Sequence, residues 1–146
     1  MNQLKEKKLN NKGFSLVELI IVIAIMAVLI GVLAPQYLKY VEKSRESADL
    51  DNYRAMITAV QVYFSDPAHT AKAGTISVDG AGEVTPSTDI APALTDAGVN
   101  AGEITMKSKK YVSQTLTFTV GSDGAYTITA TGDLASGLGI TATGTP

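Results

Sequence analysis

The stretch K-G-F-S-L-V-E-L-I-I-V-I-A-I-M-A-V-L-I-G-V-L-A-P, residues 12–35, decides the fold of this chain. From Leu16 to Ala34 it runs for nineteen residues with one ionisable side chain, that of Glu18. A helix of that length can span a bilayer core of about 30 Å, and the run exceeds the roughly 7–15 apolar residues of a cleavable signal peptide. An acidic residue at mid-bilayer costs about 2.5–3.5 kcal/mol on insertion scales, so Glu18 needs a compensating role.

A short cationic segment precedes the apolar run, because four lysines outnumber one glutamate in the first thirteen residues. A cationic leader before an apolar helix indicates membrane insertion, with the positive end kept in the cytoplasm. The tripeptide Val32-Leu33-Ala34 has the spacing that signal peptidase recognises. Pro35 follows at once, and its restricted backbone disfavours cleavage there. We therefore expect the apolar helix to remain in the mature protein.

Composition excludes several function classes. The chain has 146 residues, no cysteine, one histidine and a formal net charge of −2. Without cysteine there is neither a disulfide framework nor a thiolate metal site, and the lone His69 is expected to be a loop residue and not a metal ligand. No bulk basic surface indicates nucleic acid, and no Ser-His-Asp set, P-loop or isolated carboxylate pair indicates an enzyme. We expect no catalytic residue, no metal and no cofactor.

The helical pattern continues past Pro35, where a kink is expected. Residues 36–64 contain no glycine or proline, and they place one apolar stripe at helical spacing: Tyr53, Met56, Ile57, Val60, Tyr63 and Phe64. Opposite charges on the other face are expected to pair in solvent: Lys39 with Glu42, Lys43 with Glu46, and Arg45 with Asp49. Ser65-Asp66-Pro67 predicts the helix end. From Phe14 to Phe64 the helix would be about 75 Å long at 1.5 Å per residue.

Residues 65–146 are rich in Gly, Thr, Ala and Asp and contain short alternating segments. Apolar residues alternate with polar ones over 112–120 and over 126–131, and the turn 121–124 between them predicts an antiparallel hairpin. A strand over 75–78 and a short helix over 87–97 are also predicted, whereas 137–146 is either an edge strand or a frayed tail. For three carboxylates near glycines we expect turn roles, with a calcium site as the alternative: Asp79, Asp123 and Asp133.

The residues Lys12-Gly13-Phe14-Ser15-Leu16-Val17-Glu18, followed by the apolar run, resemble the class III signal of type IV pilins and of their relatives, the pseudopilins and competence pilins. The resemblance extends through Pro35 to the polar continuation Glu42-Lys43-Ser44-Arg45, and the rest of the chain resembles no particular subfamily. It implies an α+β, pilin-like fold in which a long N-terminal helix packs on a small antiparallel β-sheet. The expected parts are a cleaved leader (1–13), a transmembrane or filament-core helix (14–35), its amphipathic continuation (36–64) and a β-rich globular region (65–146).

The resemblance also implies roles for single residues. Prepilin peptidase would cut between Gly13 and Phe14 and would methylate the new amine of Phe14. The carboxylate of Glu18 would then meet the amine of Phe14 in a neighbouring subunit, which removes both unpaired-charge penalties and sets the axial register. The alternative is that Glu18 snorkels to the membrane interface without a partner. Tyr37 and Tyr40 flank the membrane exit, where amphipathic aromatic residues are favoured.

The function implied by this resemblance is that of a structural subunit of a type IV pilus, which serves adhesion, motility or DNA uptake. The subunit would cross the cytoplasmic membrane once before assembly and would lie in an extracellular filament afterwards. Its partners would be copies of itself, the membrane, prepilin peptidase, the assembly ATPase and the inner-membrane platform protein. Two alternatives are a pseudopilin of a type II secretion or competence system and a monomeric membrane-anchored binding module.

Overall fold

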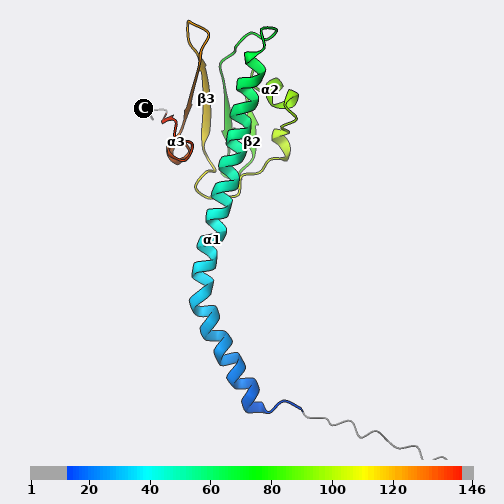
Figure 1. Ribbon diagram of the computed structural model, residues 1–146, viewed down its shortest axis with the longest axis vertical. Coiled ribbons are helices and arrows are strands. Elements are labelled where there is room, and N and C mark those ends of the chain that lie inside the picture. The colour runs from blue at the N-terminus through cyan, green and yellow to red at the C-terminus, as the bar shows by residue number, and fades with distance from the viewer. Residues whose placement is uncertain (1–12, 143–146) are drawn as a thin grey trace, which may run out of the picture. The chain divides into compact units, whose positions relative to one another are not determined.

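The computed structural model describes residues 13–142 of the chain (Figure 1). The chain divides into two compact units, Met1–Lys39 and Tyr40–Pro146, and we call the second the globular unit. Residues 1–12 of the predicted leader (1–13) and the final residues 143–146 lie outside the described residues. The elements in chain order are α1 (Leu16–Ser65), β1 (Gly74–Val78), β2 (Val84–Pro86), α2 (Ala91–Asp96), η1 (Ala101–Glu103), β3 (Thr115–Val120), β4 (Tyr126–Ala130), α3 (Gly132–Leu138) and β5 (Thr141–Ala142).

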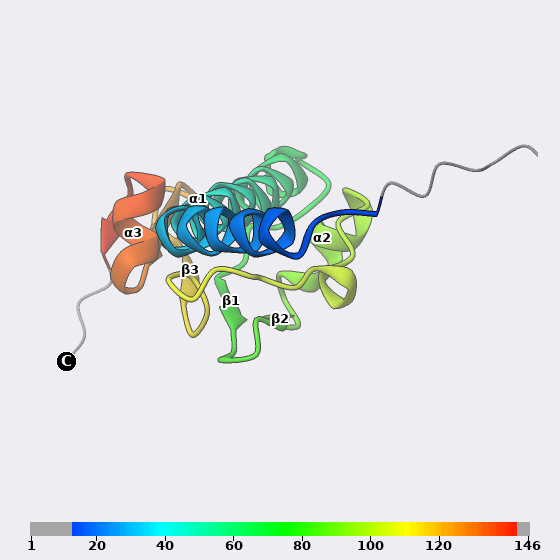
Figure 2. The same ribbon diagram turned by 90° about the horizontal axis from the view of Figure 1, so that it is seen from below.

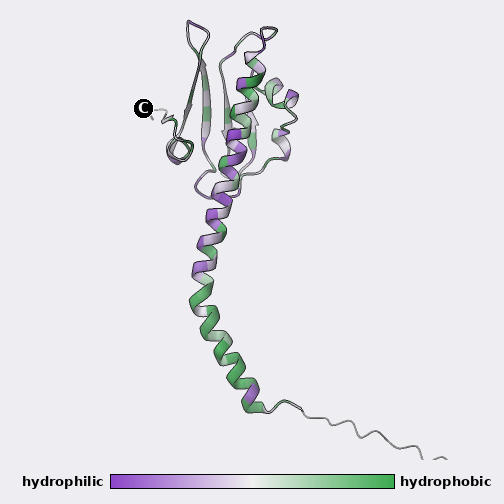
Figure 3. Cartoon of the chain, viewed as in Figure 1, coloured by the Kyte–Doolittle hydropathy of each residue, from purple (hydrophilic) through white to green (hydrophobic). Residues whose placement is uncertain are grey.

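The long helix predicted from the sequence is present as α1, which is 50 residues long and continues through Pro35. At 1.5 Å per residue it measures about 75 Å. Residues in its first part are mostly hydrophobic, and hydrophilic residues alternate with hydrophobic ones farther along (Figure 3). Both the start at Leu16 and the end at Ser65 lie within two residues of the predicted ends.

The globular unit contains a five-stranded sheet in the order β2-β1-β3-β4-β5. Neighbouring strands pair antiparallel except β4 and β5, which pair parallel, so the predicted α+β class is confirmed with a mixed sheet. The predicted hairpin is formed by β3 and β4, with Val120 opposite Tyr126 beside the turn. Its first strand begins at Thr115 instead of residue 112, because Ser113 adopts a left-handed conformation with φ of 57° that a strand does not accommodate.

The smaller elements differ more from the sequence prediction. The strand over 75–78 is confirmed as β1, whereas the helix predicted over 87–97 is limited to α2, with Pro92 in its first turn. The helix α3 was not predicted, because Gly132 and Gly137 hide its pattern. A Cβ on Gly137 would lie 2.6 Å from the Tyr111 hydroxyl oxygen and 2.9 Å from a Leu50 methyl group, so close packing requires glycine there.

One face of α1 forms the centre of the globular core. Tyr53, Met56 and Val60 are fully buried, as the apolar stripe predicted. They pack in one cluster with buried residues of the sheet such as Leu116 and Phe118. The Tyr53 hydroxyl donates to the Tyr111 carbonyl oxygen at 2.9 Å, which satisfies its polar end. Viewed from below, α1 crosses one face of the sheet, with α3 beside one sheet edge and α2 beside the other (Figure 2).

The charged face of α1 differs from the prediction that all its charges pair in solvent. Arg45 lies 3.7 Å from Glu42 and not with Asp49, and the Glu46 carboxylate lies 3.8 Å from Lys110. Asp49 is only 2% exposed and belongs to the inner face of the helix. The prediction was wrong because spacing along a helix identifies possible neighbours but not the polar groups that another segment of the chain presents to them.

Candidate assembly site

The N-terminal end of the described chain is open to a partner. Phe14 is 92% exposed, and Gly13 is also exposed. A Cβ placed on Gly13 would meet no other atom within 4 Å. Packing within the described chain therefore does not require glycine at position 13.

Glu18 lies in the first turn of α1, where its Oε2 accepts the backbone N–H of Ser15 at 2.9 Å. Ser15 precedes the first helical residue and Glu18 is the third, which is the arrangement of half a capping box. A carboxylate in the first turn is also favoured by the helix dipole. Within one chain, Glu18 therefore has a local role that the sequence prediction missed. The pattern Ser-x-x-Glu over residues 15–18 was the signal that could have revealed it.

The apolar part of α1 has no cover within the chain. Within residues 13–142, α1 is the helix long and apolar enough to cross a membrane, and none of its apolar window is buried. The large apolar side chains in this part are at least half exposed, for example Leu16 at 74% and Val28 at 68%. A continuous apolar surface of this extent marks a membrane or protein interface. Tyr37 and Tyr40 follow it, at 67% and 65% exposed.

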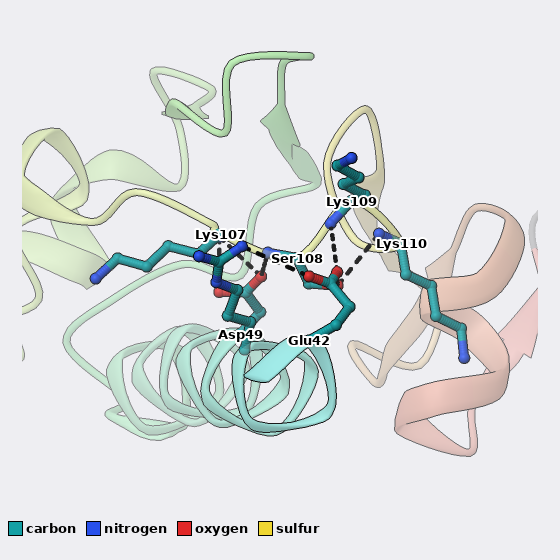
Figure 4. A network of polar contacts seen from close by, with 7 residues as sticks. Glu42, Asp49, Lys107, Ser108, Lys109 and Lys110 are labelled. Atoms are coloured by element: carbon teal, nitrogen blue, oxygen red, sulfur yellow. Dashed lines mark hydrogen bonds and ion pairs between the residues drawn. The ribbon is translucent and has the colours of Figure 1, made fainter. Parts of the chain in front are cut away.

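A second polar site, which we call the clasp, joins α1 to the loop 107–110 (Figure 4). The Asp49 carboxylate accepts the backbone N–H of Lys107 at 3.1 and 2.9 Å and that of Ser108 at 2.6 Å. Buried donors and acceptors need such partners, since an unsatisfied one costs about 1–3 kcal/mol. Asp49 thus takes the place of water as the hydrogen-bond acceptor for backbone N–H groups of a loop that lies 58 residues away in sequence.

Glu42 is the second carboxylate of the clasp, and it also binds at Ser108. Its Oε1 accepts the Ser108 hydroxyl and the Lys109 backbone N–H, both at 2.9 Å. The hydrogen bonds from the Ser108 hydroxyl and the Lys109 amide are the main causes that lower the pKa of Glu42 below its ordinary value. Burial opposes them, and the charges of Arg45 and Lys109 lower the pKa by smaller amounts. No sequence pattern predicted the clasp, because its two halves become neighbours only in the folded unit.

The other candidate ligands have structural partners. The His69 ring stacks on Tyr63 with 3.8 Å between ring centroids, and its Nδ1 lies 3.1 Å from the Tyr63 carbonyl oxygen. Asp79 accepts two backbone amides and Asp123 accepts one, each within its own turn, while Asp133 lies in the first turn of α3. Residues 13–142 contain no group of three or more His, Asp or Glu side chains that could hold a metal ion.

Residues 8–34 match the protein family described as the prokaryotic N-terminal methylation motif. This range includes Gly13, Phe14 and Glu18 together with the apolar run. The match therefore falls on the segment whose end and whose apolar surface are exposed in the structure.

Among curated proteins, the chain is 38% identical over 56 residues to the type IV major pilin protein PilA of Myxococcus xanthus, which is 38% of this chain and 26% of that protein. It is 38% identical over 101 residues to the fimbrial protein EcpC of Eikenella corrodens, covering 66% of this chain and 63% of that protein. A third relative is the type IV major fimbrial protein FimA of Dichelobacter nodosus, at 38% over 55 residues, or 38% of this chain and 35% of the relative.

These matches thus span between about a quarter and just under two thirds of the relatives' own lengths. No solved structure matches the chain. The match to the Eikenella protein is longer than α1 and so reaches into the globular unit. Taken with the methylation motif and the long helix packed on a small sheet, these relatives make the chain similar to type IV pilins and support a type IV pilin.

Proposed function

We propose that this chain is the structural subunit of a type IV pilus and polymerises through the apolar part of α1. The observation that carries this proposal is the uncovered apolar surface of residues 16–38, on a helix whose other part is built into a folded unit. Its relatives are named as major pilin and fimbrial proteins, which favours a filament subunit over a monomeric binding module. Lipid covers this surface before assembly, and neighbouring helices cover it in the filament.

We further propose that prepilin peptidase cleaves between Gly13 and Phe14 and methylates the amine of Phe14. The exposed and unpacked position of both residues supports this step, as does the methylation motif over residues 8–34. The mature chain then consists of a membrane or filament-core helix (14–35), its amphipathic continuation (36–64) and the globular region (65–146). Pro35 would kink the helix between its two functional parts.

In the proposed filament, Glu18 exchanges its local bond with Ser15 for the amine of Phe14 in a neighbouring subunit. An ammonium group in a water-poor filament core stabilises the carboxylate more than a neutral backbone N–H does. The remaining partners are the peptidase, the assembly ATPase and the inner-membrane platform protein. The subunit crosses the cytoplasmic membrane once before it enters the cell-surface filament.

Expression of the full chain in its source organism, or together with a prepilin peptidase and pilus machinery, tests the proposal. We expect an intact mass that starts at methylated Phe14, together with surface filaments that contain this chain. Gly13→Leu should accumulate unprocessed precursor without a change in fold. Glu18→Ala should give abundant, processed protein in the membrane with few filaments.

Glu103→Ala is the matched control, because Glu103 is exposed and lies in the globular unit far along the chain. It should assemble as the wild type does. Normal filaments from Glu18→Ala would show that this carboxylate does not direct assembly. A mature chain that begins at Met1, or a wild type that forms no filament, would overturn the proposed function as a whole.

A further inference from the structure

The clasp holds the loop 107–110 in one orientation and thereby displays two lysines. The backbone amides of Lys107 and Lys109 point to Asp49 and Glu42, and Ser108 between them is buried. Both lysine side chains are exposed, and within residues 13–142 neither ammonium group forms an ion pair. Lys110 differs, because it lies 3.8 Å from Glu46. The clasp therefore presents two exposed lysine ammonium groups on a fixed backbone, at what we call the clasp end of the globular unit.

The opposite end of the same unit, which we call the turn end, displays free carboxylates. It is formed by the loop after α1 and the turn between β3 and β4, which meet where Phe64 and Tyr126 lie 5.5 Å apart between ring centroids. Asp66 and Asp123 are exposed there, and each accepts one backbone amide of its own turn. In the described part of the chain neither has a cationic partner, whereas Asp89 at this end pairs with Lys72 at 3.0 Å.

The two ends are separated along both α1 and the sheet. Asp49 marks the clasp end and Phe64 the turn end, and fifteen helical residues between them correspond to about 22 Å. Strand β3 likewise runs from the loop of the clasp to the turn at Asp123 (Figure 1). Complementary patches at different places on one subunit form heterologous contacts, and these generate open filaments when they do not close into a ring.

We propose that Lys107 and Lys109 of one subunit contact the Asp66 and Asp123 end of another copy in the filament. This inference rests on the proposed filament function and assigns it a contact in the globular unit, separate from the apolar helix. Asp79 and Glu83 also lie near the clasp end, in the turn between β1 and β2, and Asp79 is held by two amides of that turn. The cationic patch is consequently confined to the loop 107–110. The contact determines which surface of a neighbouring subunit binds, and in which register, more than it adds affinity.

Neutral substitutions in the full chain test this contact with little risk to the fold. Lys107→Gln with Lys109→Gln keeps the backbone amides of the clasp, and Asp66→Asn with Asp123→Asn keeps an oxygen acceptor in each turn. Each double variant removes two exposed ion pairs, so it should lower the yield of sheared filaments about twofold to thirtyfold. High salt should weaken wild-type filaments and leave both variants unchanged.

Amine-reactive labelling read by mass spectrometry gives a second measurement. Lys107 and Lys109 should be labelled in the detergent-solubilised subunit and protected in the filament. As a matched control, Glu103→Gln with Asp133→Asn removes two exposed carboxylates that lie in η1 and α3 and not in the two turns that form the turn end, and it should leave the filament yield unchanged.

The outcomes distinguish a failure of this contact from a failure of the proposed filament function. If the wild type forms filaments but neither double variant changes their yield, or if both lysines remain labelled in filaments, the contact does not exist. If only the lysine variant has an effect, the lysines bind another anion, such as lipid phosphate, and the proposed pairing is overturned. Reversing both sets of charges together should restore filaments that either reversal alone loses. The variant for this test combines Lys107→Glu and Lys109→Glu with Asp66→Lys and Asp123→Lys.

Discussion

The two parts of α1 show how one continuous helix can carry two kinds of sequence information. None of its residues up to Lys39 is buried, whereas five residues after that point are: Asp49, Tyr53, Met56, Ala59 and Val60. In the first part, apolar character is nearly uniform around the helix. In the second part, apolar residues repeat on one face and fit the core of the globular unit.

The carboxylates follow the same division. Glu18 is exposed and bonds to a backbone amide three residues away, whereas Asp49 is buried and bonds to amides 58 and 59 residues away. An exposed side chain with a local hydrogen bond can still bind a new partner, whereas a buried side chain that bonds to distant amides stabilises the fold and is not accessible. We infer that substitutions in the first part alter assembly and that those in the second part alter stability.

The largest contrast is expected from two methionines of the same helix. Met56 is fully buried and Met26 is 53% exposed. Met56→Ala should lower the free energy of unfolding of the globular unit by about 2–5 kcal/mol, because it removes buried surface and leaves a cavity. Met26→Ala should leave that free energy unchanged. Thermal and denaturant unfolding in detergent, followed by near-UV circular dichroism, measures both, and equal losses would contradict the division of α1.

A smaller contrast is expected between the two carboxylates. Asp49→Asn places an NH₂ group against backbone donors of Lys107 and Ser108, so a loss of about 1–3 kcal/mol in unfolding free energy is expected. Glu18→Gln should leave the same unfolding transition in place and should reduce filament assembly. Chemical denaturation and electron microscopy of sheared filaments distinguish the two effects. A stable Asp49→Asn variant would mean that the loop amides find water.

Acid should weaken the clasp through Glu42. Its folded pKa is lowered below the ordinary value of 4.5, so the ionised form stabilises the fold above that value. This contribution is lost as pH falls from about 4.5 through the folded pKa. Glu42→Gln should therefore flatten part of the decrease in Tm between neutral and acid pH, and Ser108→Ala should do so less. Identical pH profiles for the wild type and Glu42→Gln would show that the carboxylate contributes nothing.

The smallest effect is expected at the solvent-facing ion pair of α1. Arg54 and Asp51 lie 3.0 Å apart with side chains 55% and 75% exposed. Such i,i+3 pairs are worth about 0.2–0.5 kcal/mol and are screened by salt. Arg54→Ala should change the unfolding free energy by no more than this amount, as measured by chemical denaturation at low and high salt. A larger loss would indicate that this face of α1 is packed.

The helix, the hairpin and the core stripe could be predicted because each depends on local periodicity. Tyr53, Met56 and Val60 follow helical spacing, and the strands at Leu116 and Ile128 alternate with polar residues. Two elements begin later than predicted, each because of a single residue. Ser113, with its positive φ, precedes β3, and Pro92 lies in the first turn of α2. The residues of the candidate assembly site were found through a motif, and their roles in assembly stay predictions.

By itself, the sequence determined that residues 16–34 form an apolar helix with one acidic side chain, since length and hydropathy are properties of the chain alone. Only the tertiary structure decided which carboxylates of α1 remain in solvent and which bind the loop at Ser108. It also decided that β5 joins the sheet parallel to β4, beyond the glycine-rich helix α3. The physical reason is that a buried carboxylate or an edge strand is stabilised by backbone groups that come from distant residues, and these are brought together only when the core around Tyr53 and Phe118 has formed.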